Sequence, residues 1–200
     1  MACPRLRSGD RRPRREAPVT SLEKNASPIR SIAGDCVLLE PQTAAHAGQM
    51  FVVLGDPAIY EHENEPPPSG EWLRERFARL ESRRSADGSE QWLNWVVRLP
   101  GSDPVGYVQA TIHENGSAAI AYVFASAYWG RGLARRAAQA MLGELAVYYG
   151  VSRVTAVLKR DNRRSLRLLE RLGFTLASPE SQATDVEPDE IVMEREMRIA

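Results

Sequence analysis

The chain has 200 residues, of which 43% are hydrophobic and 26% are charged, and its 26 Lys+Arg balance 26 Asp+Glu. This is the composition of an ordinary globular protein that can bury a core without covalent cross-links. Cys3 and Cys36 are too few for a disulfide framework or a zinc site. No apolar run approaches the roughly 20 residues that cross a bilayer. We therefore expect a cytoplasmic protein with no metal and no membrane contact.

The balanced net charge hides a basic N-terminal segment. Residues 1–30 carry eight Lys+Arg and three acids, whereas the remainder carries 18 basic and 23 acidic residues. Prolines and a lack of large apolar side chains predict a disordered tail over 1–30, followed by a single domain over 31–200. If the protein binds nucleic acid, we expect this tail to be the binding segment. The alternative interpretations of the tail are a transit peptide and an extension without function. We favour the last, because Lys24 and Lys159 are the only lysines and arginine richness is therefore chain-wide.

The first part of the presumed domain predicts elements that suit a mixed sheet with helices. A strand is expected over 36–39, and a helix over 43–54 with its cap near Thr43. Ser69 is a good N-cap for a second helix over 69–81, whose buried stripe is expected to be Trp72, Leu73, Phe77 and Leu80. Further strands are expected over 92–97, 105–112 and 118–124, with Asn115-Gly116 as the tight turn of an antiparallel hairpin.

The most informative segment is Tyr128-Trp129-Gly130-Arg131-Gly132-Leu133-Ala134, which joins the strand over 118–124 to an amphipathic helix. The helix is predicted from Leu133 by apolar residues at three- and four-residue spacing, and Gly150 ends it. With no Cβ at Gly130 and Gly132, a phosphate can approach the main chain, and the N-terminal N–H groups of the helix favour its charge. The turn therefore predicts a pyrophosphate site.

Residue spacing decides between the possible pyrophosphate ligands. A dinucleotide fingerprint requires a third glycine where Arg135 stands, and a nucleoside-triphosphate loop requires a Gly-Lys-Ser/Thr that is absent here. Downstream there follow a strand over 154–158, Asp161-Asn162, a helix that carries Ser165, and Gly173-Phe174. A last strand pair is expected over 174–177 and 191–197, joined by the polar loop 178–190.

On the Trp-Gly-Arg-Gly-Leu-Ala turn and the Asn162, Ser165, Leu168, Gly173-Phe174 spacing, the chain resembles the GNAT superfamily of N-acetyltransferases. It is most similar to their ribosomal-protein N-terminal acetyltransferase (RimJ/RimL-like) branch, over roughly residues 35–198. The resemblance implies an α/β (α+β) GNAT fold. Its central sheet is mixed and mostly antiparallel, with six to seven strands, helices on both faces, and a splayed parallel strand pair that holds acetyl-CoA.

The resemblance also implies which residues hold acetyl-CoA as co-substrate. The backbone of Tyr122, Val123 and Phe124 would bond the pantetheine amides, as a peptide adds to an open sheet edge. Arg131, Gly132, Leu133, Ala134 and Arg135 would hold the diphosphate, although Arg135 is equally well explained by a solvated helix face. Asn162 is expected to contact the cofactor, to cap the helix that follows, or both.

The catalytic residues depart from the family pattern. Many relatives carry a tyrosine seven residues after the asparagine to protonate the departing sulfur, and this chain has Leu169 there. The branch it resembles has a serine three residues after the asparagine, and Ser165 matches, so Ser165 is the expected thiolate partner; its alternative role is helix packing. The branch also carries a glutamate where this chain has Ala119.

The absence of an obvious general base affects which acceptor amines the site can use. A lysine-like amine of pKa about 10.4 adds roughly 4 to 5 kcal/mol to the barrier at pH 7, whereas an α-amine of pKa near 8 adds about 1 to 1.5 kcal/mol. A site with a weak base therefore suits an N-terminal α-amine. Alternatively, a general base could come from the loop before the second helix, which carries Glu61, His62, Glu63 and Glu65; Glu61 is the candidate. The competing interpretation of this loop is an exposed acidic segment without a catalytic role.

On the acceptor side, Trp92, Asn94 and Gln109 alternate with apolar residues and are the expected substrate contacts, with a core position as the alternative for Trp92. Together these features predict an acetyl-CoA-dependent N-acetyltransferase that acts on a primary amine by direct transfer in a ternary complex. The alternative is a non-catalytic acyl-CoA-sensing or partner-binding module. Monomer and homodimer are both compatible with the sequence, and fold does not fix the acceptor.

Overall fold

The computed structural model describes residues 29–62, 65–178 and 186–197. The disorder predicted for the N-terminal tail and most of the loop over 178–190 fall outside these residues. The description begins at Ile29 and Arg30, and the Arg30 guanidinium binds the buried Glu144 carboxylate with contacts of 2.6 and 2.8 Å. Among the described residues, Arg30, the last residue of the predicted tail, thus contacts the domain.

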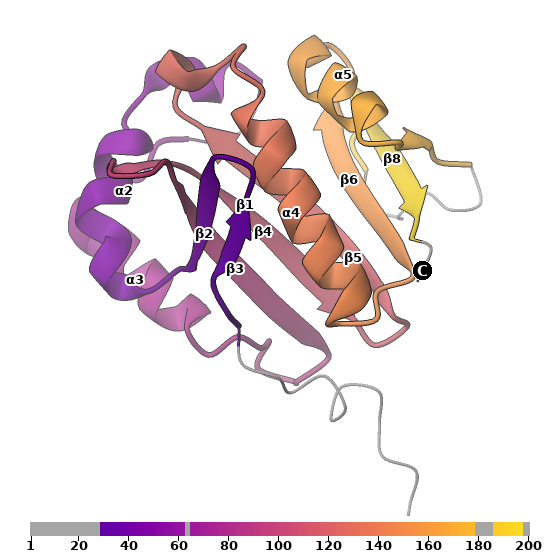
Figure 1. Cartoon of the computed structure of the whole chain (residues 1–200), viewed down its shortest axis with the longest axis horizontal. Coiled ribbons are helices and arrows are strands. Elements are labelled where there is room, and N and C mark those ends of the chain that lie inside the picture. Colours follow the sequence, from indigo (N-terminus) through magenta and orange to yellow (C-terminus); the bar gives the residue numbers. More distant parts are fainter. Residues whose placement is uncertain (1–28, 63–64, 179–185, 198–200) are drawn as a thin grey trace, which may run out of the picture.

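The eight strands of the sheet lie in the order β1-β2-β3-β4-β5-β6-β8-β7. They are β1 (Ile32–Gly34), β2 (Val37–Pro41), β3 (Glu90–Arg98), β4 (Pro104–His113), β5 (Ser117–Phe124), β6 (Arg153–Lys159), β7 (Thr175–Leu176) and β8 (Glu190–Glu196). Every neighbouring pair is antiparallel except β5 and β6, which are parallel (Figure 1). The mixed, mostly antiparallel sheet is confirmed, with one strand more than the predicted range.

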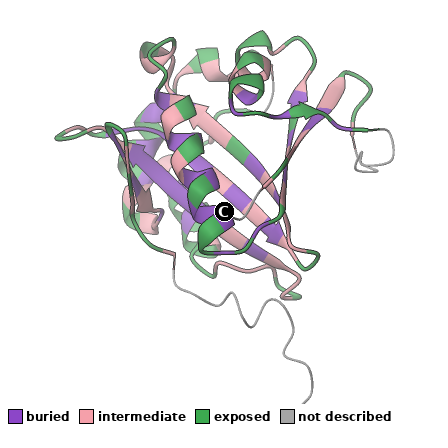
Figure 2. Ribbon diagram, turned by 45° about the vertical axis from the view of Figure 1, so that its right-hand side comes forward, coloured by how far each residue is buried: buried purple, intermediate pink, exposed green. Residues whose placement is uncertain are grey.

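The helices lie on both faces of this sheet, as predicted. They are α2 (Ala47–Val53), α3 (Gly70–Leu80), α4 (Leu133–Val147) and α5 (Arg163–Arg171), with short 3-10 turns η1 (Ala44–His46), η2 (Pro57–Tyr60) and η3 (Ser126–Tyr128). The larger apolar core lies between α4, α5 and one sheet face, and a smaller one packs α2 and α3 on the other. Figure 2 shows α4 with buried residues toward the sheet and exposed residues toward solvent.

Two details of the predicted elements are wrong. The strand predicted over 36–39 is the second strand, β2, and it begins at Val37, because Cys36 occupies the β1–β2 turn with a φ of 59° that a strand does not allow. Trp72 is 38% exposed rather than buried, whereas Leu73 and Phe77 of the same helix are buried. Trp72 lies in the first turn of α3, where its ring contacts the Arg76 guanidinium at 5.6 Å instead of the sheet.

The parallel pair separates along its length. β5 and β6 are paired only from Ser117↔Arg153 to Ala119↔Thr155, although β5 continues to Phe124 and β6 to Lys159. Beyond Ala119 the β6-facing edge of β5 has no strand beside it. The splayed strand pair predicted from the family resemblance is thus present, and it opens toward the α4 N-terminus. Within the described ranges no helix is both long and apolar enough to span a bilayer, and no cluster of potential metal ligands occurs there.

Candidate functional site

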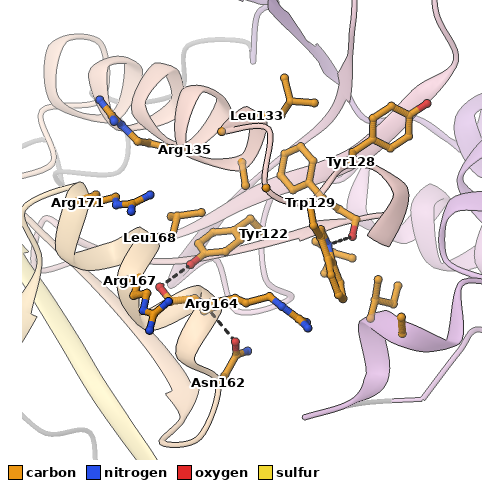
Figure 3. Close-up of a pocket in the computed structure, with 18 of the residues that line it drawn as sticks. Tyr122, Tyr128, Trp129, Leu133, Arg135, Asn162, Arg164, Arg167, Leu168 and Arg171 are labelled. Carbon is orange, nitrogen blue, oxygen red and sulfur yellow. Dashed lines mark hydrogen bonds between the residues drawn. The ribbon is translucent and has the colours of Figure 1, made fainter.

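A pocket of about 550 Å³ opens where β5 and β6 separate, between the turn before α4 and one side of α5 (Figure 3). Nine of the residues predicted to bind the cofactor line this pocket, and they come from two neighbouring stretches of chain and from the start of α5. Those that line the pocket are Tyr122, Val123, Phe124, Gly132, Leu133, Ala134, Arg135, Asn162 and Ser165. The structure therefore gathers residues up to 43 positions apart, such as Tyr122 and Ser165, around one cavity.

The floor of the pocket at the α4 end is bare main chain. Gly130 and Gly132 both have a φ of 74°, a left-handed conformation that glycine adopts without strain, and Gly132 is the N-cap of α4. A Cβ added at either position would meet no atom within 4 Å, so the space beside the main chain is open. No side chain caps α4 and no acid lies in its first turn, which leaves its N-terminal amides available to an anion.

The β5 edge contributes backbone and one anchored aromatic ring. Trp129 Nε1 donates a 2.8 Å hydrogen bond to the Phe124 carbonyl oxygen, so this carbonyl already has a partner. The Arg164 guanidinium lies over the Trp129 ring at 4.2 Å. The open backbone groups that remain at this edge are those of Tyr122, because the Val123 carbonyl oxygen points toward Gly106 of β4. The role of Trp129 in holding the turn against β5 was not anticipated from the sequence.

The start of α5 contacts the phenol of Tyr122 through its backbone. Asn162 Oδ1 accepts a 3.1 Å hydrogen bond from the Ser165 backbone N–H, so Asn162 caps α5 and also lines the pocket. Tyr122 Oη lies 3.5 Å from the Ser165 carbonyl oxygen. Burial raises the pKa of Tyr122 to about 12, against the effect of its hydrogen bond with Ser165. The Tyr122 phenol is therefore a neutral proton donor at physiological pH.

Leu169, which stands where many relatives carry a tyrosine, does not line the pocket. Leu169 is only 1% exposed and packs in the core beneath α5. Ala119 lies at the last paired position of β5 and β6, where no carboxylate takes the place of the absent glutamate. Ser165 and Tyr122 are thus the hydroxyl groups at this wall of the pocket.

The loop that carries Glu61 lies against α5. Glu61 Oε2 is 3.3 Å from Arg164 Nη1, its side chain is 58% exposed, and it is not among the pocket-lining residues. His62 does line the pocket, and its Nδ1 lies 3.2 Å from Asp161 Oδ1. Of the other cluster members, Glu65 is exposed and Glu63 falls outside the described residues.

The predicted acceptor contacts lie elsewhere. Asn94 and Gln109 face each other across β3 and β4, and Asn94 is buried. Trp92 is half-buried and its Nε1 donates to Glu90 Oε2 at 2.9 Å. Alternation along β3 places Trp92 and Asn94 on the face that carries α2 and α3, opposite to α4. None of the three lines the pocket, and their role stays a prediction.

Asp56 fastens the η2 turn, which supplies Ala58 and Ile59 to the pocket, to the end of β5. Its Oδ2 accepts a 2.7 Å bond from the Ser126 N–H and its Oδ1 a 3.0 Å bond from the Ala58 N–H. Hydrogen bonds with Ser126 and then Ala58 lower the pKa of Asp56.

Replacing Asp56 with alanine should cost about 1 kcal/mol of unfolding free energy, as for other lost N-caps. Because the folded-state pKa lies below the unfolded value, this contribution is complete above roughly pH 5 and fades as the pH falls below about 4. Urea unfolding of both proteins between pH 3 and 7 measures the difference. Asp103→Ala, which removes an exposed carboxylate bonded to Gln49, is the control and should change little. A gap that stays constant down to pH 3 would contradict this assignment.

Four arginines surround the pocket, of which sequence reasoning named one. Arg135 comes from α4, and Arg164, Arg167 and Arg171 come from α5. In Figure 3 they lie on both sides of the space between the two helices. The signal in the sequence was the recurrence of arginine on α5 at intervals of three and four residues, which places the side chains on one helix face.

The comparisons with known proteins agree with this architecture. Residues 37–175 match the family model described as "Acetyltransferase (GNAT) domain", and the chain belongs to this family. Members of the family use acetyl-CoA, so the co-substrate predicted from the sequence is confirmed.

Solved structures share the fold at low sequence identity. RimL, a ribosomal L7/L12 α-N-protein acetyltransferase in complex with coenzyme A, is 16% identical; the match covers 85% of this chain and 99% of RimL, with a TM-score of 0.71. The ribosomal-protein-S5-alanine acetyltransferase from Vibrio fischeri is 16% identical, with 83% and 96% covered and a TM-score of 0.69. A probable GNAT acetyltransferase from Chromobacterium violaceum is 22% identical, with 85% and 92% covered and a TM-score of 0.68. These neighbours accord with the branch that the sequence resembles.

Proposed function

We propose that this protein transfers an acetyl group from acetyl-CoA to a primary amine, directly and within a ternary complex. The observation that carries the proposal is the separation of β5 from β6 just before an uncapped, glycine-lined helix N-terminus. An open strand edge can bind an amide-containing arm, and the adjoining helix end can bind a diphosphate. Acetyl-CoA contains both groups in this order.

The residues present fit such a ligand. The main chain at the α4 N-terminus, from Gly132 to Ala134, is open to the diphosphate, since Gly132 has no Cβ and no side chain caps the helix. Arg131 and Arg135 supply positive charge beside it. At the other end of the pocket, the backbone of Tyr122 is available for the pantetheine amides, and Asn162 lies opposite at the start of α5.

Acetyl transfer needs a neutral amine, which attacks the thioester carbonyl carbon, and a proton for the sulfur as the carbon–sulfur bond breaks. The bound thioester supplies the activated acetyl group. Ser165 is the proposed donor toward the thiolate, because it lines the pocket at the start of α5. Glu61 remains the weak candidate for the base, because its carboxylate is paired with Arg164 and lies outside the pocket lining.

The acceptor that best suits this arrangement is an α-amino group at a protein N-terminus. Such an amine is largely neutral near pH 8 without help from a base, whereas a lysine side chain is not. The names of two structural neighbours, which describe ribosomal-protein N-terminal acetyltransferases, support the same class. Small-molecule amines of similarly low pKa are the other acceptors to be tested.

The test is a free-thiol release assay with acetyl-CoA and a panel of N-terminal peptides, polyamines, aminoglycosides and lysine peptides between pH 6 and 9. We expect peptides with a free α-amine to react fastest, and their rate to follow deprotonation of the amine itself. If the rate instead rises with the deprotonation of an enzyme group that titrates below pH 7, that group is a general base of the protein. No thiol release with any amine, at saturating acetyl-CoA, would contradict the proposal.

Replacing Ser165 with alanine should lower kcat by about 100-fold, the lower range for a positioned proton donor, and leave the affinity for CoA nearly unchanged. Ser152→Ala is a matched control, since Ser152 lies after α4 and outside the pocket lining. Steady-state kinetics with calorimetric CoA binding separates the two effects. An unchanged kcat in Ser165→Ala would assign the serine to helix packing only.

A second candidate function is a non-catalytic acyl-CoA-binding module. It is favoured by Leu169 and Ala119, which replace the two side chains that relatives use for proton transfer. Strong stabilisation by acetyl-CoA without thiol release across the whole amine panel would establish this alternative.

A further inference from the structure

Two basic residues of α5 lie in its first turn, where a helix is least able to tolerate them, whereas Arg171 lies in its last turn. Arg163 and Arg164 occupy the first turn, no acid accompanies them there, and Arg167 and Arg171 follow at intervals of three and four residues. Positive side chains at a helix N-terminus oppose the helix dipole, and like charges three or four residues apart repel. A local arrangement that lowers stability is expected mainly at functional sites.

The α4 N-terminus faces the same pocket and has the same character. Its first turn carries Arg135, follows Arg131, and contains no acid. Of the four arginines that line the pocket, Arg164 is paired with Glu61 and lies over Trp129. Among the residues that the structure describes, Arg135, Arg167 and Arg171 have no ion-pair partner in the pocket. The cavity is thus built for a ligand with several negative charges.

The diphosphate accounts for only one end of this positive region. The glycine turn and Arg135 lie at the α4 end of the pocket, whereas Arg167 and Arg171 lie on the other helix. The two side chains are four residues apart and exposed, on one face of α5 (Figure 3). A ligand phosphate that leaves the α4 turn between the two helices would come under both guanidinium groups.

We propose that Arg167 and Arg171 form a second anion subsite, which binds the 3′-phosphate of the CoA nucleotide. This inference rests on the proposed function. The 3′-phosphate is a phosphomonoester with up to two negative charges, and planar guanidinium groups bind such oxygens through paired, charge-assisted hydrogen bonds. The subsite makes the protein select CoA thioesters over thioesters that lack this phosphate.

Binding of CoA and of 3′-dephospho-CoA to the full chain, measured by calorimetry, tests the proposal. We expect the wild type to bind CoA about 10- to 100-fold more tightly, as for one or two hydrogen bonds to a charged group. In Arg167→Gln/Arg171→Gln the two ligands should bind within about two-fold of each other, and the affinity for 3′-dephospho-CoA should stay near that of the wild type. The preference of the wild type should also fall as salt is raised.

Arg163→Gln is the matched control, because Arg163 is an exposed arginine of the same helix that does not line the pocket. It should keep the full preference for CoA.

Equal binding of both ligands by the wild type would overturn the subsite and leave the proposed function intact. Parallel loss of affinity for both ligands in the double variant would also overturn it, because the arginines would then act only through general attraction. If neither ligand binds the wild type, the proposed function itself fails.

Discussion

Replacing Gly132 with alanine should weaken acetyl-CoA binding by about 100-fold. The new Cβ would lie in the open space beside the α4 N-terminus, where no protein atom comes within 4 Å, so any loss must come from the ligand. A phosphate held away from the main chain loses hydrogen bonds to backbone amides, each worth roughly 1.5 to 3 kcal/mol when the partner is charged. Calorimetric titration of the variant with acetyl-CoA measures the loss.

The strain of alanine at positive φ must be separated from this effect. Gly132 has a φ of 74° and Gly150, beyond the other end of α4, has a φ of 66°, and neither has a neighbour within 4 Å of a built Cβ. Both alanine variants should lose about 1 kcal/mol of unfolding free energy. Only Gly132→Ala should lose cofactor affinity. Equal affinity in the two variants would show that the diphosphate does not bind at this turn.

Replacing Gly106 with alanine should destabilise the protein by about 3 kcal/mol, the largest effect we expect from a single added methyl group. Gly106 lies on β4 opposite Phe124, and a Cβ there would overlap the Val123 carbonyl oxygen and come within 2.9 Å of the Phe124 ring. Backbone cannot rotate away as a side chain can, so β5 must shift at the edge that lines the pocket. Urea unfolding measures the stability.

Gly143→Ala provides the opposite result as a control. Gly143 lies within α4, is exposed, and would place its Cβ in open space. Alanine there should stabilise the protein by about 0.5 to 1 kcal/mol, because glycine is a poor helix former. A Gly106→Ala variant as stable as the wild type would mean that β4 and β5 are more widely spaced than this structure has them.

The sequence was sufficient to predict the glycine turn before α4 and the start of α5 because both depend on local chemistry. A strand, two glycines with positive φ and a helix without a capping side chain follow one another within a short stretch. Asn162 and Ser165 are likewise three residues apart on one helix. The splay of β5 and β6 was implied by family resemblance rather than by any feature of the two strands themselves.

Other parts of the site depend on contacts between distant residues and could not be predicted in this way. Glu61 was considered as a base, yet Arg164, 103 positions later, is its partner. Arg167 and Arg171 are indistinguishable in sequence from a solvated helix face until α5 is placed beside α4. Trp72 has the spacing of a core residue, but the sheet does not extend beneath it.

The most direct test of the central claim is the thermal unfolding of the full chain in the presence of acetyl-CoA. A ligand at about 100 times its dissociation constant adds roughly 2.7 kcal/mol to the unfolding free energy. In a protein of this size, that corresponds to a rise in Tm of about 5 to 10 °C. We predict such a rise in the wild type at about 1 mM acetyl-CoA, and a much smaller one in Gly132→Ala. An unchanged Tm in the wild type at this concentration would contradict the account.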